Sequence, residues 1–148
     1  MADDDALTAA RPSGMVKASA VLHGLSGTFV ALSGLQVAVG VHFVDPLMRP
    51  IPWALIASGV ALIALASRVY RARRWAGAAG VAGAAAAVLV TGAWGAYSLA
   101  NGMLSLVVLL AFPLSCLSAV AALLALAPIA RAAAARARLA DEGIDLGL

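Results

Sequence analysis

Charged residues are scarce in this sequence. Only 11% of the 148 residues are Asp, Glu, Lys or Arg, whereas soluble domains usually contain ~25%. Apolar residues make up 64% of the chain and the mean hydropathy is +0.99, which excludes a water-soluble fold and an intrinsically disordered chain. Cysteine is almost absent as well: Cys116 stands alone, so no disulfide can form within the chain. These deficits leave an integral membrane protein of one small domain.

The few charged residues are confined to short segments between long apolar runs. Asp, Glu, Lys and Arg are missing from residues 18–44, 50–67 and 75–130. About 20 helical residues cross the ~30 Å hydrocarbon core of a bilayer, so the first two runs supply one span each, and the third folds back to supply two. We therefore predict an all-α integral membrane four-helix bundle, with transmembrane helices at about 15–44, 51–69, 75–99 and 103–126.

Local signals set the ends of these helices. Asn101 and Gly102 both tolerate positive φ and mark the turn between the third and fourth helices. Ser13 suits the N-cap of the first helix, and Pro52 suits the first turn of the second. Pro128 lies where the fourth helix is expected to end. We expect a disordered cytoplasmic head at 1–14, a transmembrane domain at 15–127 and a basic, partly helical cytoplasmic tail at 128–148.

The basic residues lie almost entirely on one side of this topology. All of the ten Lys and Arg residues except Arg49 fall in the head, in the tail or in the loop between the second and third helices. Because Lys and Arg favour the cytoplasmic side, we expect both termini to be cytoplasmic. The Ala, Gly and Arg bias is typical of proteins from GC-rich bacterial genomes. We therefore expect the membrane to be a bacterial inner membrane. Topology and lipid headgroup contact are the roles expected for Arg68, Arg71, Arg73 and Arg74, and no nucleic-acid partner is expected.

Small residues recur at heptad spacing in every predicted helix. Helices in lipid associate through close packing of such residues, and a period of 3.5 favours left-handed crossings at ~+20°. The series are Ala20, Gly24, Gly27, Ala31, Gly34 and Ala38 in the first helix, Gly77, Gly80, Ala84, Ala87, Thr91 and Gly95 in the third, Ala111, Ser115, Ser118, Ala122 and Ala125 in the fourth, and a weaker Ala54, Ala57, Ala61 and Ala64 in the second. The residues predicted to pack helices together are Gly24, Gly27, Ala31, Gly34, Gly77, Gly80 and Ala84.

The first helix also carries a polar face. Ser26, Ser33 and Gln36 cluster ~150° from the small-residue series at 100° per residue, and the same helix carries His23 and His42. Three interpretations stay open. The helix lies centrally in the bundle with Gln36 bonded to a neighbouring helix, or the face meets another subunit, or it lines a water-filled path.

Chemistry-bearing residues are few. The two histidines lie roughly 28 Å apart along one helix, so one haem cannot bridge them within a chain, although a parallel dimer can pair two copies of His23. Cys116 has no ligating neighbour, and no carboxylate lies inside a predicted span. We therefore expect no cofactor, no metal and no catalytic residue. Trp53, Trp75 and Trp94 are interpreted as interfacial anchors.

Two functions follow from this sequence. The first is a non-catalytic accessory, scaffold or assembly subunit that acts through helix packing, with membrane lipids and other membrane subunits or itself as partners. The alternative is a homo-oligomeric pore or small-solute transporter lined by Ser26, Ser33 and Gln36, with His42 as a further lining residue. Substitution of Gly27 and Gly34 by leucine is expected to disrupt assembly under the first hypothesis.

Overall fold

The computed structural model describes residues 4–40, 48–103 and 106–144. These residues form one short helix and four long ones: α1 (Asp4–Ala9), α2 (Gly14–Gly40), α3 (Ile51–Tyr70), α4 (Arg74–Ala100) and α5 (Leu106–Asp141). No strand occurs in these ranges. The four long helices are each long and apolar enough to span a membrane. This confirms the all-α class and the four predicted helices, while Val41–Val44 of the first predicted span lies outside the described residues.

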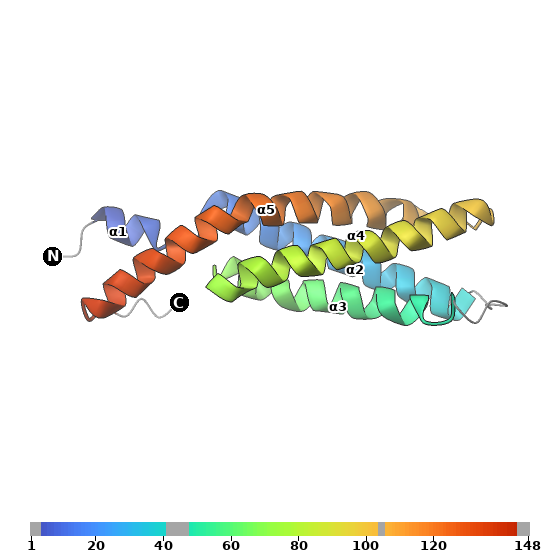
Figure 1. Cartoon of the computed structure of the whole chain (residues 1–148), viewed down its shortest axis with the longest axis horizontal. Helices are drawn as coiled ribbons and strands as arrows, with labels where there is room; N and C mark the ends of the chain where they lie inside the picture. The colour runs from blue at the N-terminus through green and yellow to red at the C-terminus, as the bar shows by residue number, and fades with distance from the viewer. Residues whose placement is uncertain (1–3, 41–47, 104–105, 145–148) are drawn as a thin grey trace.

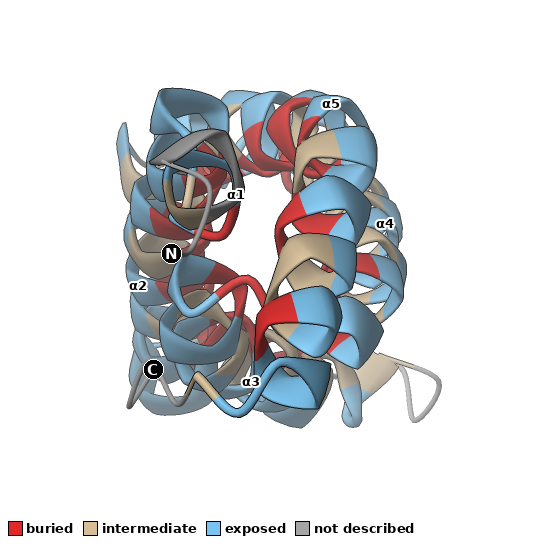
Figure 2. Cartoon of the chain, turned by 90° about the vertical axis from the view of Figure 1, so that its left-hand side faces the viewer, coloured by how far each residue is buried: buried red, intermediate tan, exposed pale blue. Residues whose placement is uncertain are grey.

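The long helices run up and down beside one another (Figure 1). Each helix contacts its predecessor and successor, and α5 closes the ring against α2. Helices α2 and α4 therefore lie across the bundle and touch at few positions. The α3–α4 turn, α1 and the end of α5 lie at one end of the bundle, so most of the described arginines gather there (Figure 1). Viewed from this end, the buried parts of the helices face inward (Figure 2).

Three of the four turn and cap signals are confirmed: the turn at Asn101 and Gly102, the cap at Ser13 and the helix start at Pro52. Gly102 adopts φ +67, and the side-chain amide of Asn101 donates to the carbonyl of Tyr97 at 2.8 Å. The hydroxyl of Ser13 accepts from the amide of Val16 at 3.4 Å, and Pro52 lies in the first turn of α3. Short-range backbone chemistry is sufficient for these features because each involves residues within four positions of one another.

Both ends of the chain are more helical than expected. Residues Asp4–Ala9, placed in a disordered head from sequence, form α1, which contacts α5. The helix predicted to end at 126 continues through Pro128 to Asp141. A proline removes only one backbone donor, and the alanine-rich segment after it has strong helix propensity. The tail helix is also held by buried Ile129, Ala132 and Leu139.

The bundle interior is built from heptad faces with little bulk. In α5 the buried positions include Val108, Ala111, Ser115, Ser118, Ala122, Ala125, Ile129 and Ala132, which alternate by three and four and confirm the predicted series. The buried face of α4 includes Ala76, Gly77, Gly80, Ala84, Ala87, Thr91, Trp94 and Ser98. This face departs from the predicted one at its end, because Trp94 and Ser98 are buried in place of Gly95. Trp94 is 2% exposed, so it is a core residue and not an interfacial anchor.

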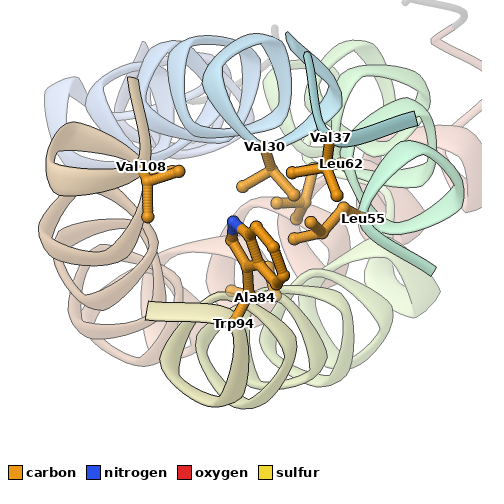
Figure 3. Packing of buried hydrophobic residues seen from close by; sticks show 9 residues of the cluster. Val30, Val37, Leu55, Leu62, Ala84, Trp94 and Val108 are labelled. Carbon is orange, nitrogen blue, oxygen red and sulfur yellow. The ribbon is translucent and has the colours of Figure 1, made fainter. Parts of the chain in front are cut away.

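Trp94 is the largest of the fully buried side chains. Its indole points from α4 into the bundle toward Val30 of α2 and Leu55 of α3 (Figure 3), and Leu62 belongs to the same buried cluster. Most of the other buried residues in this cluster are valine or alanine, so a single large ring occupies the space that they leave. Trp53 and Trp75 are 68% and 54% exposed, as expected for side chains at helix starts.

The face that α3 turns inward is not the predicted alanine series. Ala57, Ala61 and Ala64 are exposed, and the buried residues of α3 are Pro52, Leu55, Gly59, Leu62 and Val69. This series contains only alanine, with neither the glycine of the first and third series nor the serine of the fourth. Alanine and leucine are both apolar, so a series of alanines does not show which side of such a helix is buried.

Candidate functional site: a buried polar network and its glycine supports

The polar face of α2 is turned into the bundle. Its buried positions include Ser19, His23, Ser26, Val30, Ser33 and Val37, which repeat every three or four residues. His23 and Ser26 are fully buried and Ser33 is 1% exposed. Gln36 is exposed, and His42 lies outside the described residues. The structure therefore brings three of the five predicted polar-face residues together inside one chain.

His23 is the centre of this network. Its Nδ1 lies 2.8 Å from the carbonyl oxygen of Ser19, and its Nε2 lies 3.2 Å from the carbonyl oxygen of Gly80 on α4. The hydroxyl of Ser118 on α5 lies 3.2 Å from Nδ1. A neutral imidazole has one N–H, so it donates to only one of the two carbonyls at a time. With the hydrogen on Nε2, the ring donates to Gly80, and Nδ1 accepts from Ser118.

That tautomer joins three helices through one side chain. It connects α2 to α5 and also to α4 across the bundle, where few other contacts exist. The other tautomer donates to Ser19 within α2 and gives no bond to Gly80. A buried nitrogen left without a partner costs about 1–3 kcal/mol, which opposes the tautomer with hydrogen on Nδ1, while the 2.8 Å contact between Nδ1 and the Ser19 carbonyl oxygen opposes the tautomer with hydrogen on Nε2.

Gly80 makes room for the imidazole. A Cβ atom at this position would lie 3.0 Å from His23 Nε2 and 3.3 Å from a methyl carbon of Val69. The glycine thus has two roles: it admits the ring, and it exposes its carbonyl oxygen to it. This explains why a helix accepts glycine here at a cost of about 1 kcal/mol relative to alanine.

Further hydroxyl groups extend the network along α2 and α5. The hydroxyls of Ser26 and Ser115 lie 3.1 Å apart, and Ser115 donates to the carbonyl of Ala111 at 2.8 Å. Ser33 and Thr91 each donate to the carbonyl four residues earlier in their own helix. These bonds satisfy hydroxyl groups inside an apolar bundle, where unsatisfied polar groups are costly.

The glycine series of α2 packs against α3, not against the polar network. A Cβ atom at Gly27 would lie 2.6 Å from the carbonyl oxygen of Gly59, and one at Gly34 would lie 2.7 Å from that of Pro52. A Cβ at Gly59 would in turn lie 2.5 Å from the backbone nitrogen of Ala31. Because the obstructing atoms belong to backbones, a larger residue at any of these three glycines would push the two helices apart.

Not every predicted packing glycine has this role. A Cβ atom at Gly24 or Gly95 would meet nothing within 4 Å, so neither residue permits a close approach. A Cβ at Gly77 would make ordinary or slightly tight contacts with Leu126 and Ile129 of α5. Gly59 was missed from sequence because it does not belong to the alanine series predicted for its helix, and its position opposite Gly27 reveals its role.

Arg136 joins α5 to two turns at the basic end of the bundle through hydrogen bonds. Its Nε donates to the carbonyl of Ala10 at 2.9 Å, and its Nη1 donates to the carbonyl of Arg71 at 2.7 Å. One guanidinium group thus ties α5 to the α1–α2 turn and to the α3–α4 turn. Of the predicted topology arginines, Arg68, Arg71, Arg73 and Arg74 all have exposed side chains. Arg136 continues the heptad spacing of α5, because it lies four residues after Ala132 and three before Leu139, and both of these are buried. This spacing is the sequence signal that could have identified it.

The described residues contain no group of three or more His, Cys, Asp or Glu residues close enough to hold a metal ion. Cys116 is half-buried on α5. No family model matches the chain, and no curated protein or solved structure matches it significantly.

Proposed function

We propose that this chain is a multi-pass protein of a bacterial inner membrane, with both termini cytoplasmic, that acts without catalysis as an accessory, scaffold or assembly subunit. One observation carries the proposal: the buried polar side chains form hydrogen bonds within the chain itself. His23, Ser26, Ser115 and Ser118 bond to one another or to backbone carbonyls, and these bonds hold α2, α4 and α5 together. Such side chains serve the internal packing of the protein.

The outer surface of the bundle is the part that meets lipid or partner helices. Large apolar side chains are exposed along it, among them Leu25, Leu32, Leu89, Leu117 and Leu124. The cluster of exposed arginines at the end with the α3–α4 turn supports a cytoplasmic assignment for that end. A rigid apolar bundle with one basic end suits a subunit that binds other membrane helices or a second copy of itself.

The alternative of a homo-oligomeric pore receives less support from this geometry. A pore between subunits lined by the polar face of α2 needs Ser26 and Ser33 at the outer surface, and both are buried inside the chain. Among the described residues proposed for that lining, Gln36 is the one with an exposed side chain, and His42 lies outside the described residues.

The test of the packing function is the mass of the assembly extracted from native membranes in mild detergent. We expect the wild type and Gly24→Ala to elute as one discrete complex larger than the monomer, and Gly27→Ala/Gly34→Ala to lose that complex, because the latter pair separates α2 from α3. A monomeric wild type would contradict the accessory function. An unchanged complex in the double variant would contradict the role of α2–α3 packing in it.

A further inference from the structure

A hollow of about 440 Å³ lies between the α1–α2 turn and α5. Two arginines, two hydroxyl residues and two prolines line most of it: Arg11, Arg131, Thr8, Ser13, Pro12 and Pro128. No acidic residue belongs to the lining. The hollow is distinct from the buried network at His23, because its lining residues lie at the basic end of the chain and several of them are exposed.

The polar groups of this hollow match a phosphate. A guanidinium group presents N–H donors in a planar fork that binds phosphate oxygens in pairs, and Arg11 and Arg131 supply two such forks. Ser13 immediately precedes α2, so the positive end of that helix dipole faces the same region. The Ser13 oxygen accepts from Val16 while its hydroxyl hydrogen can donate to a bound anion.

The hollow is also held in shape by the rest of the fold. The Arg136 guanidinium bonds to the carbonyl of Ala10, one residue before Arg11, and so fixes the α1–α2 turn to α5. Ala10 is itself fully buried. The two arginines are therefore brought together by a turn whose backbone is anchored, and not by two independent mobile segments.

Its position along the helices indicates the source of the phosphate. Arg131 is the first charged residue after the uncharged run 75–130, and Lys17 is the last one before the run 18–44. In a bilayer, residues at the ends of such runs lie at the level of the lipid headgroups. Ala9, Pro12 and Pro128 give the hollow an apolar portion that suits the glycerol and upper acyl region of a lipid.

We propose that this hollow binds the headgroup phosphate of an anionic phospholipid, with Arg11 and Arg131 as its ligands. The proposal rests on the membrane location proposed above. Occupancy of the site fastens α1 and the α5 extension to the membrane surface, because the lipid then bridges residues from both segments.

The test uses the full-length chain in mild detergent and native mass spectrometry. Phosphatidylglycerol, phosphatidylcholine and inorganic phosphate are added in separate titrations. We expect phosphatidylglycerol to bind more tightly than phosphatidylcholine, and Arg11→Gln/Arg131→Gln to weaken its binding by about tenfold or more. The matched control is Arg73→Gln/Arg74→Gln, which removes the same charge from the same end of the bundle outside the hollow. Because the headgroup contacts expected of these two arginines are diffuse, the control should weaken phosphatidylglycerol binding far less than the variant in the hollow.

Several results would overturn the proposal. Equal losses in the two double variants would show that diffuse basic charge attracts the lipid. Equal affinity for the two lipids, or displacement of phosphatidylglycerol by millimolar inorganic phosphate, would exclude a specific lipid site. Circular dichroism checks that the double variant folds. If it does not fold, the single variant Arg11→Gln, in the α1–α2 turn, is tested in its place. Release of the wild type from membranes by alkaline carbonate would instead contradict the membrane location, so the two failures are distinguishable.

Discussion

The contact between His23 and Gly80 shows how one residue depends on another far away in sequence. The His23 imidazole lies 3.2 Å from a carbonyl oxygen on α4, and a Cβ atom at position 80 would crowd it at 3.0 Å from Nε2. From sequence, His23 belonged to a polar face and Gly80 to a small-residue series, with nothing to connect them. Each residue's tendency to be buried could be predicted, but their pairing depends on how α2 and α4 are rotated.

Alanine at position 80 should destabilise the bundle. The added Cβ would lie 3.0 Å from Nε2, so the ring must shift and its bond to the Gly80 carbonyl lengthens. Overpacking costs about 1–3 kcal/mol and alanine returns about 1 kcal/mol of helix propensity, so a net loss of about 1 kcal/mol is expected for Gly80→Ala. Thermal unfolding in detergent, followed by circular dichroism, measures it.

The control for this substitution is on the same helix. Gly95 has open space at its Cβ position, so Gly95→Ala should leave the midpoint of unfolding unchanged or raise it. Equal midpoints for Gly80→Ala and Gly95→Ala would show that His23 does not press against position 80.

The ends and the buried faces of the helices could be predicted only where the local sequence marks them strongly. The starts of α3 and α4, the Asn101–Gly102 turn and the inward face of α5 follow from charge-free runs, turn residues and heptad spacing. The inward face of α3 and the burial of Trp94 did not follow, because an apolar helix has no polar side to mark its outside. Packing partners decide such faces, and they are distant in sequence.

The extension of α5 beyond Pro128 has a structural role that can be measured. Arg136 on this extension donates to backbone carbonyls of the two turns at the basic end. Substitution Arg136→Gln should release those turns, because a neutral amide lacks the charge and the reach of the guanidinium fork. Hydrogen–deuterium exchange should then speed up at the amides near Ala10 and Arg71.

Arg138→Gln is the matched control, because Arg138 lies two residues further on in α5 with an exposed side chain. Its exchange pattern in the two turns should equal that of the wild type. Equal protection in both variants would mean that Arg136 does not hold the turns.

In the whole molecule, the polar face of α2 is enclosed within a single chain. The sequence left three interpretations of this face open, and the structure places His23, Ser26 and Ser33 inside the bundle. The same arrangement separates the two uses of α2: its glycines approach α3, and its polar residues bond across to α4 and α5. A protein built this way has its outer surface available for lipid and partner helices.

Disulfide formation between Ser26→Cys and Ser115→Cys, in a Cys116→Ser background, tests this claim most directly. The two hydroxyl oxygens lie 3.1 Å apart, so thiols at the same positions should join within one chain when membranes are oxidised. Trypsin cleavage in the exposed Arg71–Arg74 turn then separates the halves that carry the two cysteines. We expect halves that stay joined on a non-reducing gel and separate after reduction. A covalent dimer, or halves that separate without reduction, would contradict it.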